Sequence, residues 1–353
     1  MHFLDTAGFE QTFISLQPYG AIHKYLEDTM PYISFTKRSN KDLNLKTGVR
    51  SILKLHRSNS KNIIFSIGHP TSFIAAVASY FSNFSLVISH MQQPGYFKNM
   101  ESIWKRYLHQ FIYGFYVRRS DMIHSLSSEV KEHLLDKGIS EAKLFSVYIG
   151  VDFEQVRKQK QLVEHTLNQP ENLFRILMVG RLAPEKNYLL ALEAFSLLHK
   201  TVPNVKLLIA GEGPMCMDLK NLVKELNLEN KIEFLGYVDN IPALMNSADL
   251  FLHVATTEGY GQVYLESLLC GTPILSSRTG VSIDLARQFP KAFYVLSDFH
   301  PRTLCELLFR IIKEKPNLNH EEKDLHEILY EHEIGFVFSE ISKSFRIAIE
   351  SNA

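Results

Sequence analysis

The chain has 353 residues, a length that suits two domains better than one hydrophobic core. Hydrophobic residues make up 45% and charged residues 22%, which excludes a disordered chain. Basic and acidic residues number 38 each, and this balance gives no reason to expect a nucleic-acid partner. Residues 1–150 are more basic, with 17 Lys or Arg against 11 Asp or Glu. That excess suits an anionic surface or acceptor, or is a chance imbalance on a solvated face.

The cysteines and the apolar runs exclude further classes of protein. Cys216, Cys270 and Cys305 lack the Cys-x-x-Cys spacing of a zinc site, and they form no disulfide framework. A reducing compartment is expected. No apolar run reaches the roughly 18 residues of a membrane span, and the N-terminal residues do not resemble a signal peptide. We therefore expect a cytoplasmic protein.

Short β-branched segments alternate with helical patterns along the first part of the chain. Expected strands are Phe13–Leu16, Tyr32–Phe35, Ile63–Ile67 and Leu86–Ser89, and expected helices are Ala21–Met30, Leu45–Leu55 and Phe73–Phe81. This alternation predicts a parallel sheet with helices on its faces.

One helix of this part, Met100–Arg119, has an apolar stripe made of Trp104, Leu108, Phe111 and Phe115, with basic residues beside it. Two interpretations are open. Contact with a membrane surface is one. The other is an ordinary helix whose stripe packs on its own sheet, and this one is favoured because apolar stripes usually face a core.

A second run of strands and helices begins near Phe174, and its strands are continuously apolar, as at Leu207–Ala210. Strands that are covered on both faces have this pattern. The polar, Gln-rich segment Asp152–Asn172 is the expected domain junction. The prediction is an α/β protein with two doubly wound, Rossmann-like domains that face a cleft and bind ligands at the carboxyl ends of their strands.

The strongest motif runs from Thr257 to Glu266, with the sequence TEGYGQVYLE. Glu258 follows a strand beside glycines, which let backbone amides approach a ligand closely. A helix that starts near Gly261 would direct its free N–H groups at an anion. Glu266, about one turn into that helix, could then accept hydrogen bonds from a ribose, and Glu258 would face the next group along. A glycosidase pair of carboxylates is rejected, because this spacing suits donor binding better.

A second motif, Gly180 to Asn187 (GRLAPEKN), lies on another turn between a strand and a helix. Arg181 and Lys186 could both bind a diphosphate. The chain contains no Asp-x-Asp sequence for a metal ion, so these side chains and the helix start are expected to neutralise phosphate instead. A third turn, Gly211-Glu-Gly-Pro214, is a weak signal alone. Together the three turns should open toward one cleft.

The order Gly-Arg-x4-Lys, Ala-Gly-Glu-Gly-Pro and Glu-x7-Glu resembles the retaining glycosyltransferases of family 4, which have the GT-B fold. The resemblance implies that Arg181 and Lys186 hold the donor diphosphate, that Glu266 binds the ribose and that Glu258 binds the transferred sugar. It also implies backbone contacts to phosphate and sugar from Gly261, Gln262 and Val263, and a place beside the base for Gly236, Tyr237 and Val238.

In the first domain, the resemblance places His90, which follows the strand Leu86–Ser89, near the reacting carbon. His69 also follows a strand, and a structural role is the safer interpretation there. The family's first-strand Gly-Gly loop corresponds to Leu16–Gly20, where only Gly20 is present to approach the donor phosphate. The expected domains are a short N-terminal acceptor-side domain, 1–152, with a C-terminal helix at 336–353 packing back on it, and a nucleotide-sugar-binding domain, 153–335.

The resemblance implies a hexosyltransferase with no cofactor, using a nucleoside-diphosphate sugar and a glycan or lipid-linked acceptor, and the missing Asp-x-Asp sequence predicts that it is metal-independent. The expected setting is surface polysaccharide or glycolipid synthesis in the cytoplasm, at the inner face of the membrane. Two alternatives stay open: a sugar-nucleotide epimerase or hydrolase on the same fold, and a catalytically silent nucleotide-sugar-binding partner of another transferase.

Overall fold

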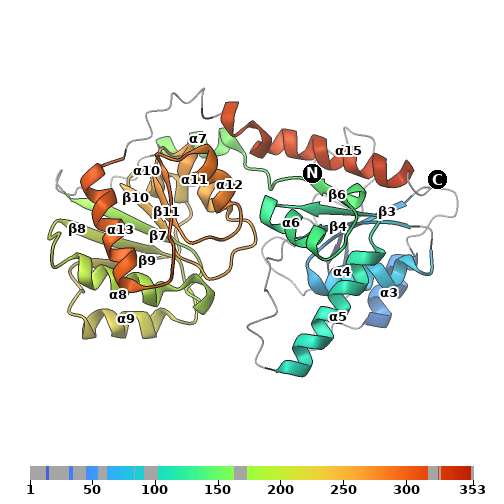
Figure 1. The fold of residues 1–353 in the computed structure, drawn as a ribbon, viewed down its shortest axis with the longest axis horizontal. Coiled ribbons are helices and arrows are strands. Elements are labelled where there is room, and N and C mark those ends of the chain that lie inside the picture. Colours follow the sequence, from blue (N-terminus) through green and yellow to red (C-terminus); the bar gives the residue numbers. More distant parts are fainter. Residues whose placement is uncertain are drawn as a thin grey trace. The chain divides into compact units, whose positions relative to one another are not determined.

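The computed structural model describes residues 13–15, 32–34, 45–54, 62–82, 84–90, 102–162, 173–316, 325 and 327–350. The chain divides into two compact units (Figure 1). The first comprises Met1–Tyr148 and Gly335–Ala353, and the second comprises Ile149–Ile334.

The second unit contains a six-stranded parallel sheet with the order β12-β11-β10-β7-β8-β9. Its strands are β7 (Phe174–Val179), β8 (Val205–Ala210), β9 (Ile232–Gly236), β10 (Leu250–His253), β11 (Ile274–Ser276) and β12 (Phe293–Val295). Its helices are α7 (Phe153–Gln161), α8 (Tyr188–Leu198), α9 (Cys216–Glu225), α10 (Ile241–Asn246), α11 (Gln262–Leu269), α12 (Ser282–Gln288) and α13 (Pro301–Glu314). The predicted doubly wound fold is confirmed for this unit.

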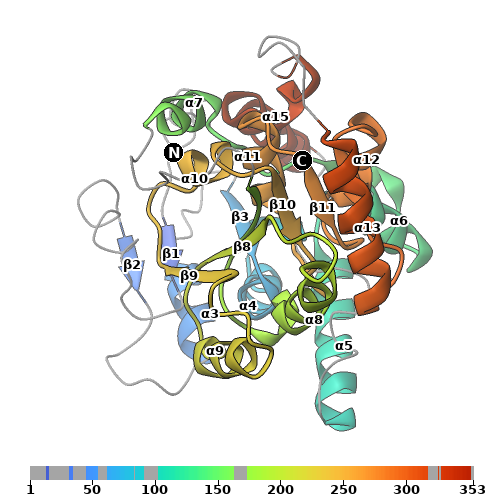
Figure 2. The same ribbon diagram turned by 90° about the vertical axis from the view of Figure 1, so that its left-hand side faces the viewer.

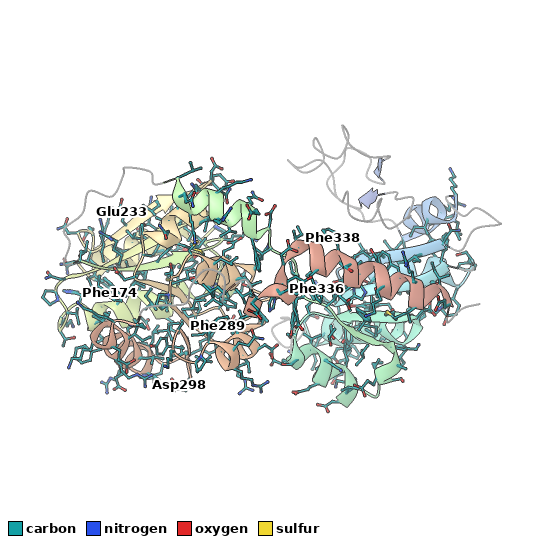
Figure 3. All side chains as sticks on the ribbon, turned by 90° about the horizontal axis from the view of Figure 1, so that it is seen from above. Phe174, Glu233, Phe289, Asp298, Phe336 and Phe338 are labelled. Atoms are coloured by element: carbon teal, nitrogen blue, oxygen red, sulfur yellow. The ribbon has the colours of Figure 1, made fainter. Side chains whose placement is uncertain are left out.

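Helices cover both faces of this sheet (Figure 2). One face packs with α8, α9 and α13 in a single core, to which Ile176, Leu207 and Leu252 contribute from the strands. On the opposite face, Phe251 contacts Tyr264 of α11, with ring centroids 6.5 Å apart. Phe289, labelled in Figure 3, directly follows α12 and is among the largest fully buried side chains.

The segment Asp152–Asn172, predicted as a junction, begins instead with the helix α7. Asp152 caps it by accepting a hydrogen bond from the amide of Gln155, at 2.8 Å, and Phe153 and Val156 are buried. Polar composition hid this helix, because its apolar residues are few and its exposed face is long. The capping aspartate was the available signal.

The first unit contains a four-stranded parallel sheet in the order β3-β4-β5-β6, and a separate parallel pair, β1 and β2. The strands are β1 (Phe13–Ser15), β2 (Tyr32–Ser34), β3 (Asn62–Ile67), β4 (Phe84–His90), β5 (Met122–Ser125) and β6 (Leu144–Ser146). The helices are α3 (Leu45–Lys54), α4 (His69–Ser79), α5 (Ile103–Arg119), α6 (Ser128–Asp136) and α15 (Ile334–Glu350). Helix α4 starts four residues before its predicted position, because Gly68 ends the preceding turn with φ +91° and Pro70 suits a first helical turn.

The C-terminal helix α15, whose first two turns carry the labelled Phe336 and Phe338 in Figure 3, packs on the first sheet. Phe345 and Ala348, three positions apart on one side of the helix, form a small core with Val87 and Met122. The hydroxyl of Ser344 lies 2.7 Å from Nε2 of the buried His124.

The favoured interpretation of α5 is wrong. Three of its four predicted stripe residues face solvent, with Trp104 80%, Phe111 74% and Leu108 57% exposed, and only Phe115 packs against the core. Tyr116 and Val117, on the other side of the helix, are the buried residues. The helix has apolar residues on both sides, so the periodicity alone did not identify the side that packs on the sheet.

Acid is expected to destabilise the first unit through His124. Burial lowers its pKa to about 4, below the value of an unfolded chain, so the folded state binds fewer protons. The free energy of unfolding is highest above the unfolded pKa. It falls by about 1.4 kcal/mol per pH unit as the pH drops from there toward 4. Thermal unfolding at pH 7 and pH 5 should show a smaller pH dependence in His124→Gln than in the wild type or in a His199→Gln control. An equal dependence in all three would contradict this assignment.

Candidate functional site

The candidate site lies where the order of strands in the second sheet reverses. β7 and β10 are neighbours in the sheet, but the chain leaves β7 toward β8 on one side and leaves β10 toward β11 on the other. Loops diverge at such a point and leave a crevice at the carboxyl ends of the strands. The two strongest sequence motifs are the loops that follow β7 and β10, so the topology brings them together.

A direct contact joins these two loops. Nζ of Lys186, at the end of the first loop, lies 2.5 Å from Oε2 of Glu258 in the second. Both side chains remain about one-fifth exposed, so solvent or a ligand can reach the pair. The backbone supports the contact, since the amide of Thr256 donates to the carbonyl of Glu185 at 2.8 Å.

His253, the last residue of β10, is the third member of this group. Its Nε2 lies 3.1 Å from Oε2 of Glu258, and the amide of Gly259 donates to Oε1 at 3.1 Å. Burial alone would raise the pKa of Glu258, but the hydrogen bond from His253 and the charge and hydrogen bond of Lys186 bring it down to about 2. Burial lowers the pKa of His253. Glu258 is therefore an anion, and because an ionised carboxylate can only accept, Nε2 of His253 donates the hydrogen bond to it.

Arg181 lies at the start of the same loop as Lys186, with an exposed side chain. None of the ion pairs in the described part of the chain includes it. A guanidinium in this state can offer its whole fork of donors to an anion. The loop after β7 thus supplies one cation already paired with a carboxylate and one that is not.

The glycines of the first and third motifs let the turns after β7 and β8 fit into each other. Gly211 has φ +139°, and a Cβ atom there would lie 2.0 Å from the carbonyl oxygen of Gly180. A Cβ atom on Gly213 would lie 2.4 Å from the carbonyl oxygen of Leu182. The amide of Leu182 donates to the carbonyl of Glu212, at 2.9 Å. The Gly-Glu-Gly-Pro turn is therefore needed for packing, and it fixes the loop that carries Arg181.

Helix α11 begins immediately after Gly261, whose φ of +91° suits glycine. A Cβ atom there would lie 2.3 Å from the ring of Tyr264. The first amides of a helix, here those of Gln262 and Val263, have no partner within the helix and can bind an anion. Glu266 follows in the second turn, and burial raises the pKa of its carboxyl group.

The turn after β9 is tied to the same group of loops. Gly236 ends the strand with φ +67°, and its carbonyl accepts the amide of Gly211 at 2.7 Å. Tyr237 follows with its side chain 73% exposed, and Val238 is half-buried. An exposed ring beside a fixed turn can stack on a flat ligand group.

Three contributors were not found from the sequence: His253, Tyr260 and His332. The hydroxyl of Tyr260 lies 2.6 Å from Nδ1 of His332, 72 residues further along the chain. Gln262 donates to the carbonyl of Gly150 at 3.3 Å. These bonds tie the Glu258 loop to both ends of its unit. No sequence motif predicts the roles of these three residues, because their partners are distant in the chain or because the residue lies within a strand.

The remaining predicted site residues belong to the first unit. His90 is the last residue of β4, so it lies at the carboxyl edge of the first sheet. Gly20 lies outside the described residues. His69 has structural partners, since its ring nitrogens lie 3.2 Å from the hydroxyl of Tyr116 and 2.9 Å from Nδ1 of His109.

Comparison with known proteins gives a consistent result. Residues 159–324 match the family described as Glycosyl transferases group 1. A 4-alpha-N-acetylgalactosaminyltransferase of Campylobacter jejuni, named for a diphospho-undecaprenol substrate, is 33% identical over 63% of this chain and 59% of its own length. The chain therefore spans less than two thirds of that relative.

An Escherichia coli alpha-1,3-galactosyltransferase, also named for a diphosphoundecaprenol substrate, is 24% identical over 84% of this chain and 78% of its own. The structure of HepE from Anabaena in complex with UDP superimposes with a TM-score of 0.75 at 18% identity, covering 98% of this chain and 95% of that one. The predicted GT-B fold is thereby confirmed. The Campylobacter jejuni and Escherichia coli relatives are both named as transferases. Their names do not favour the alternatives of an epimerase, a hydrolase or a catalytically silent partner.

Substituting Gly211 tests whether the fitted turns hold the site. Backbone strain alone would lower the free energy of unfolding of Gly211→Ala by about 1–3 kcal/mol. The loss should be larger than that, because the new Cβ atom also overlaps the carbonyl of Gly180. Gly271→Ala is the matched control, since Gly271 has φ +80° but open space around it. Urea unfolding should show a larger loss for Gly211→Ala than for Gly271→Ala. Equal losses would show that the turns do not depend on this close approach.

Proposed function

We propose that the chain, of which residues 159–324 match the family described as Glycosyl transferases group 1, transfers a hexose-type sugar from a nucleoside-diphosphate sugar to a glycan or lipid-linked acceptor, with retention at the anomeric carbon. The observation that carries this proposal is the contact of Lys186 with Glu258 at the switch point of the second sheet, in a loop that also carries the exposed Arg181. Cations and a carboxylate are both needed there, because the donor offers a diphosphate and a polyhydroxylated ring.

The diphosphate is bound by Arg181, Lys186 and the first amides of α11. Two cations and a helix start can together offset the charge of a diphosphate without a metal ion. The ammonium group of Lys186 then donates hydrogen bonds both to the phosphate and to Glu258. This arrangement orients the carboxylate that contacts the sugar relative to the phosphate that leaves.

The nucleoside occupies the other turns of the unit. Glu266 accepts hydrogen bonds from the ribose hydroxyls, and Gly236, Tyr237 and Val238 lie beside the base. Burial raises the pKa of Glu266, and a ribose diol that donates to the carboxylate favours the ionised form.

Charge builds on the donor's β-phosphate as the bond to the sugar breaks. Arg181, Lys186 and the backbone amides of Gly261, Gln262 and Val263 stabilise that charge, and losing one such group commonly costs about 10²–10³ in rate. Glu258, kept ionised by His253 and Lys186, binds the hydroxyls of the transferred sugar. For the first unit, the family resemblance assigns His90 a catalytic role and Gly20 a contact with the donor phosphate, and both assignments are part of this proposal.

The acceptor is the part of the proposal that the relatives' names support most directly. Two relatives are named for diphospho-undecaprenol substrates, and another is named an alpha-monoglucosyldiacylglycerol synthase, from Streptococcus pneumoniae. A lipid-linked acceptor requires contact with a membrane, which we place at its cytoplasmic face. Within the described residues, no helix is long and apolar enough to span a bilayer.

Variants of the two glutamates should separate binding from turnover. Glu266→Ala is expected to raise the dissociation constant of a nucleoside diphosphate about tenfold, through lost hydrogen bonds to the ribose. Glu258→Ala and His90→Ala should lower turnover more than donor binding. Calorimetry and a turnover assay measure both effects, with the surface variant Glu229→Ala as control. Unchanged nucleotide affinity in Glu266→Ala would refute its assignment.

Removal of divalent cations should leave sugar transfer intact, because side chains and a helix start neutralise the leaving phosphate. The measurement is turnover after extensive dialysis against EDTA, followed by addition of Mg²⁺. Arg181→Gln should lose turnover in the same assay, with or without Mg²⁺. Complete loss of wild-type activity in EDTA, restored by Mg²⁺, would contradict the metal-free mechanism.

A further inference from the structure

A continuous apolar ridge lies on the exposed side of α5. Its members are large side chains at helical spacing, and all are more than half exposed: Ile103, Trp104, Tyr107, Leu108 and Phe111. The N-terminal half of α5, which carries them, extends beyond the other elements of the first unit (Figures 1 and 2). Exposed Tyr80 and Phe81, which directly follow α4, add to the apolar surface of the unit. We call the five α5 residues the α5 ridge.

The opposite side of α5 fixes the rotation of the helix, so the ridge cannot turn inward. Tyr116 and Val117 are part of the core of the first unit. The hydroxyl of Tyr116 lies 3.2 Å from Nδ1 of His69, and Nδ1 of His109 lies 2.9 Å from its Nε2. These bonds pin α5 to the start of α4. The ridge is exposed because the opposite side of the helix, with His109, Tyr116 and Val117, packs on the rest of the first unit.

The charges on α5 are all of one sign. The helix contains Lys105, Arg106, Arg118 and Arg119 and no acidic residue. An apolar side rich in aromatic residues, flanked by Lys and Arg, is typical of helices that lie in the plane of a membrane interface. A second copy of the chain is a poor occupant, because a symmetric contact would bring two such helices together and their charges would repel.

A pocket of about 530 Å³ adjoins the ridge at the C-terminal part of α5. Phe111 belongs to both, and the pocket also has three basic side chains, those of Arg118, Arg119 and Lys143, against one acidic side chain, that of Asp121. Arg119 is engaged within the protein, because it lies over the ring of Tyr80, at 5.1 Å, and donates to the carbonyl of Ser79.

Arg118 is the pocket's available cation. Its side chain is exposed, its one hydrogen bond is to a carbonyl of its own helix, and no described acidic side chain pairs with it. An anionic group bound there would lie next to Phe111, where the apolar ridge begins. One amphipathic molecule, with a phosphate at one end and hydrocarbon at the other, fits both features.

We propose that the α5 ridge inserts into the interface of an anionic lipid bilayer, and that the adjoining pocket takes the phosphate of a lipid headgroup. The ridge provides the apolar contact, and Arg118 with its basic neighbours provides attraction to the anionic surface. This surface belongs to the first unit and is distinct from the proposed donor site. Donor binding therefore tests the proposed sugar transfer separately.

Trp104 makes the proposal directly measurable, because it is the single tryptophan of the chain. Its emission reports the environment of the ridge without labelling. Vesicles of an equal mixture of phosphatidylcholine and phosphatidylglycerol should shift the emission of the full chain to the blue, and lipids with brominated acyl chains should quench it. Vesicles of phosphatidylcholine alone should bind more weakly.

Two pairs of variants assign the effect. Leu108→Ser/Phe111→Ser keeps Trp104 as the probe and should weaken vesicle binding at least about tenfold, because two apolar side chains that would be buried in the bilayer are lost. Met217→Ser/Phe299→Ser, at exposed apolar positions of the second unit, is the control and should bind as the wild type. Arg118→Gln should weaken binding to the anionic vesicles about fivefold, whereas Arg287→Gln on α12 should not.

Three results would overturn the proposal. One is the absence of any vesicle-dependent shift in the wild type. Another is equal binding by Leu108→Ser/Phe111→Ser. The third is a blue shift that depends on protein concentration without lipid and accompanies a dimer in light scattering, which would assign the ridge to a second copy of the chain. Nucleoside-diphosphate binding by the variants, measured in parallel, shows that the second unit is folded.

Discussion

The ion pair between Lys186 and Glu258 is the interaction on which the site depends. It joins two loops whose paired residues are 72 positions apart in the chain, and it does so at the point where the sheet changes direction. A half-buried carboxylate would otherwise tend to protonate. Lys186 and His253 keep Glu258 ionised, so the site holds a fixed negative charge next to a fixed positive one. A sugar phosphate presents hydroxyls and phosphate oxygens in that same order.

Close packing of the loops keeps this pair in register. Gly211 and Gly213 bring the turn after β8 against the backbone of Gly180 and Leu182, at distances that no side chain permits. The amide of Thr256 bonds to Glu185, and Tyr260 bonds to His332. The loops at this edge are therefore held by backbone and side-chain contacts with their neighbours, and these contacts fix the positions of the functional side chains. Rigid support of this kind is what precise binding of a charged donor requires.

Much of this arrangement could be predicted from the sequence, because it rests on local patterns. Continuous apolar strands and glycine turns identified the second sheet, and Glu258, Lys186 and Arg181 follow those strands directly. His253 could not be predicted, since a histidine inside a buried strand looks like a core residue. Helix α5 was misassigned for a different reason. Both of its sides are apolar, and a contact with His69, some forty residues earlier, decides which side packs inward.

The central claim is that Lys186 alternates between Glu258 and a phosphate group of the donor. Calorimetric titration of a nucleoside diphosphate into Lys186→Met and Glu258→Gln tests it most directly. The dissociation constant is expected to rise about tenfold or more in Lys186→Met, through loss of a charge-assisted hydrogen bond. Equal or tighter binding is expected in Glu258→Gln, where Lys186 no longer has a competing carboxylate. Wild-type affinity in Lys186→Met would contradict the account.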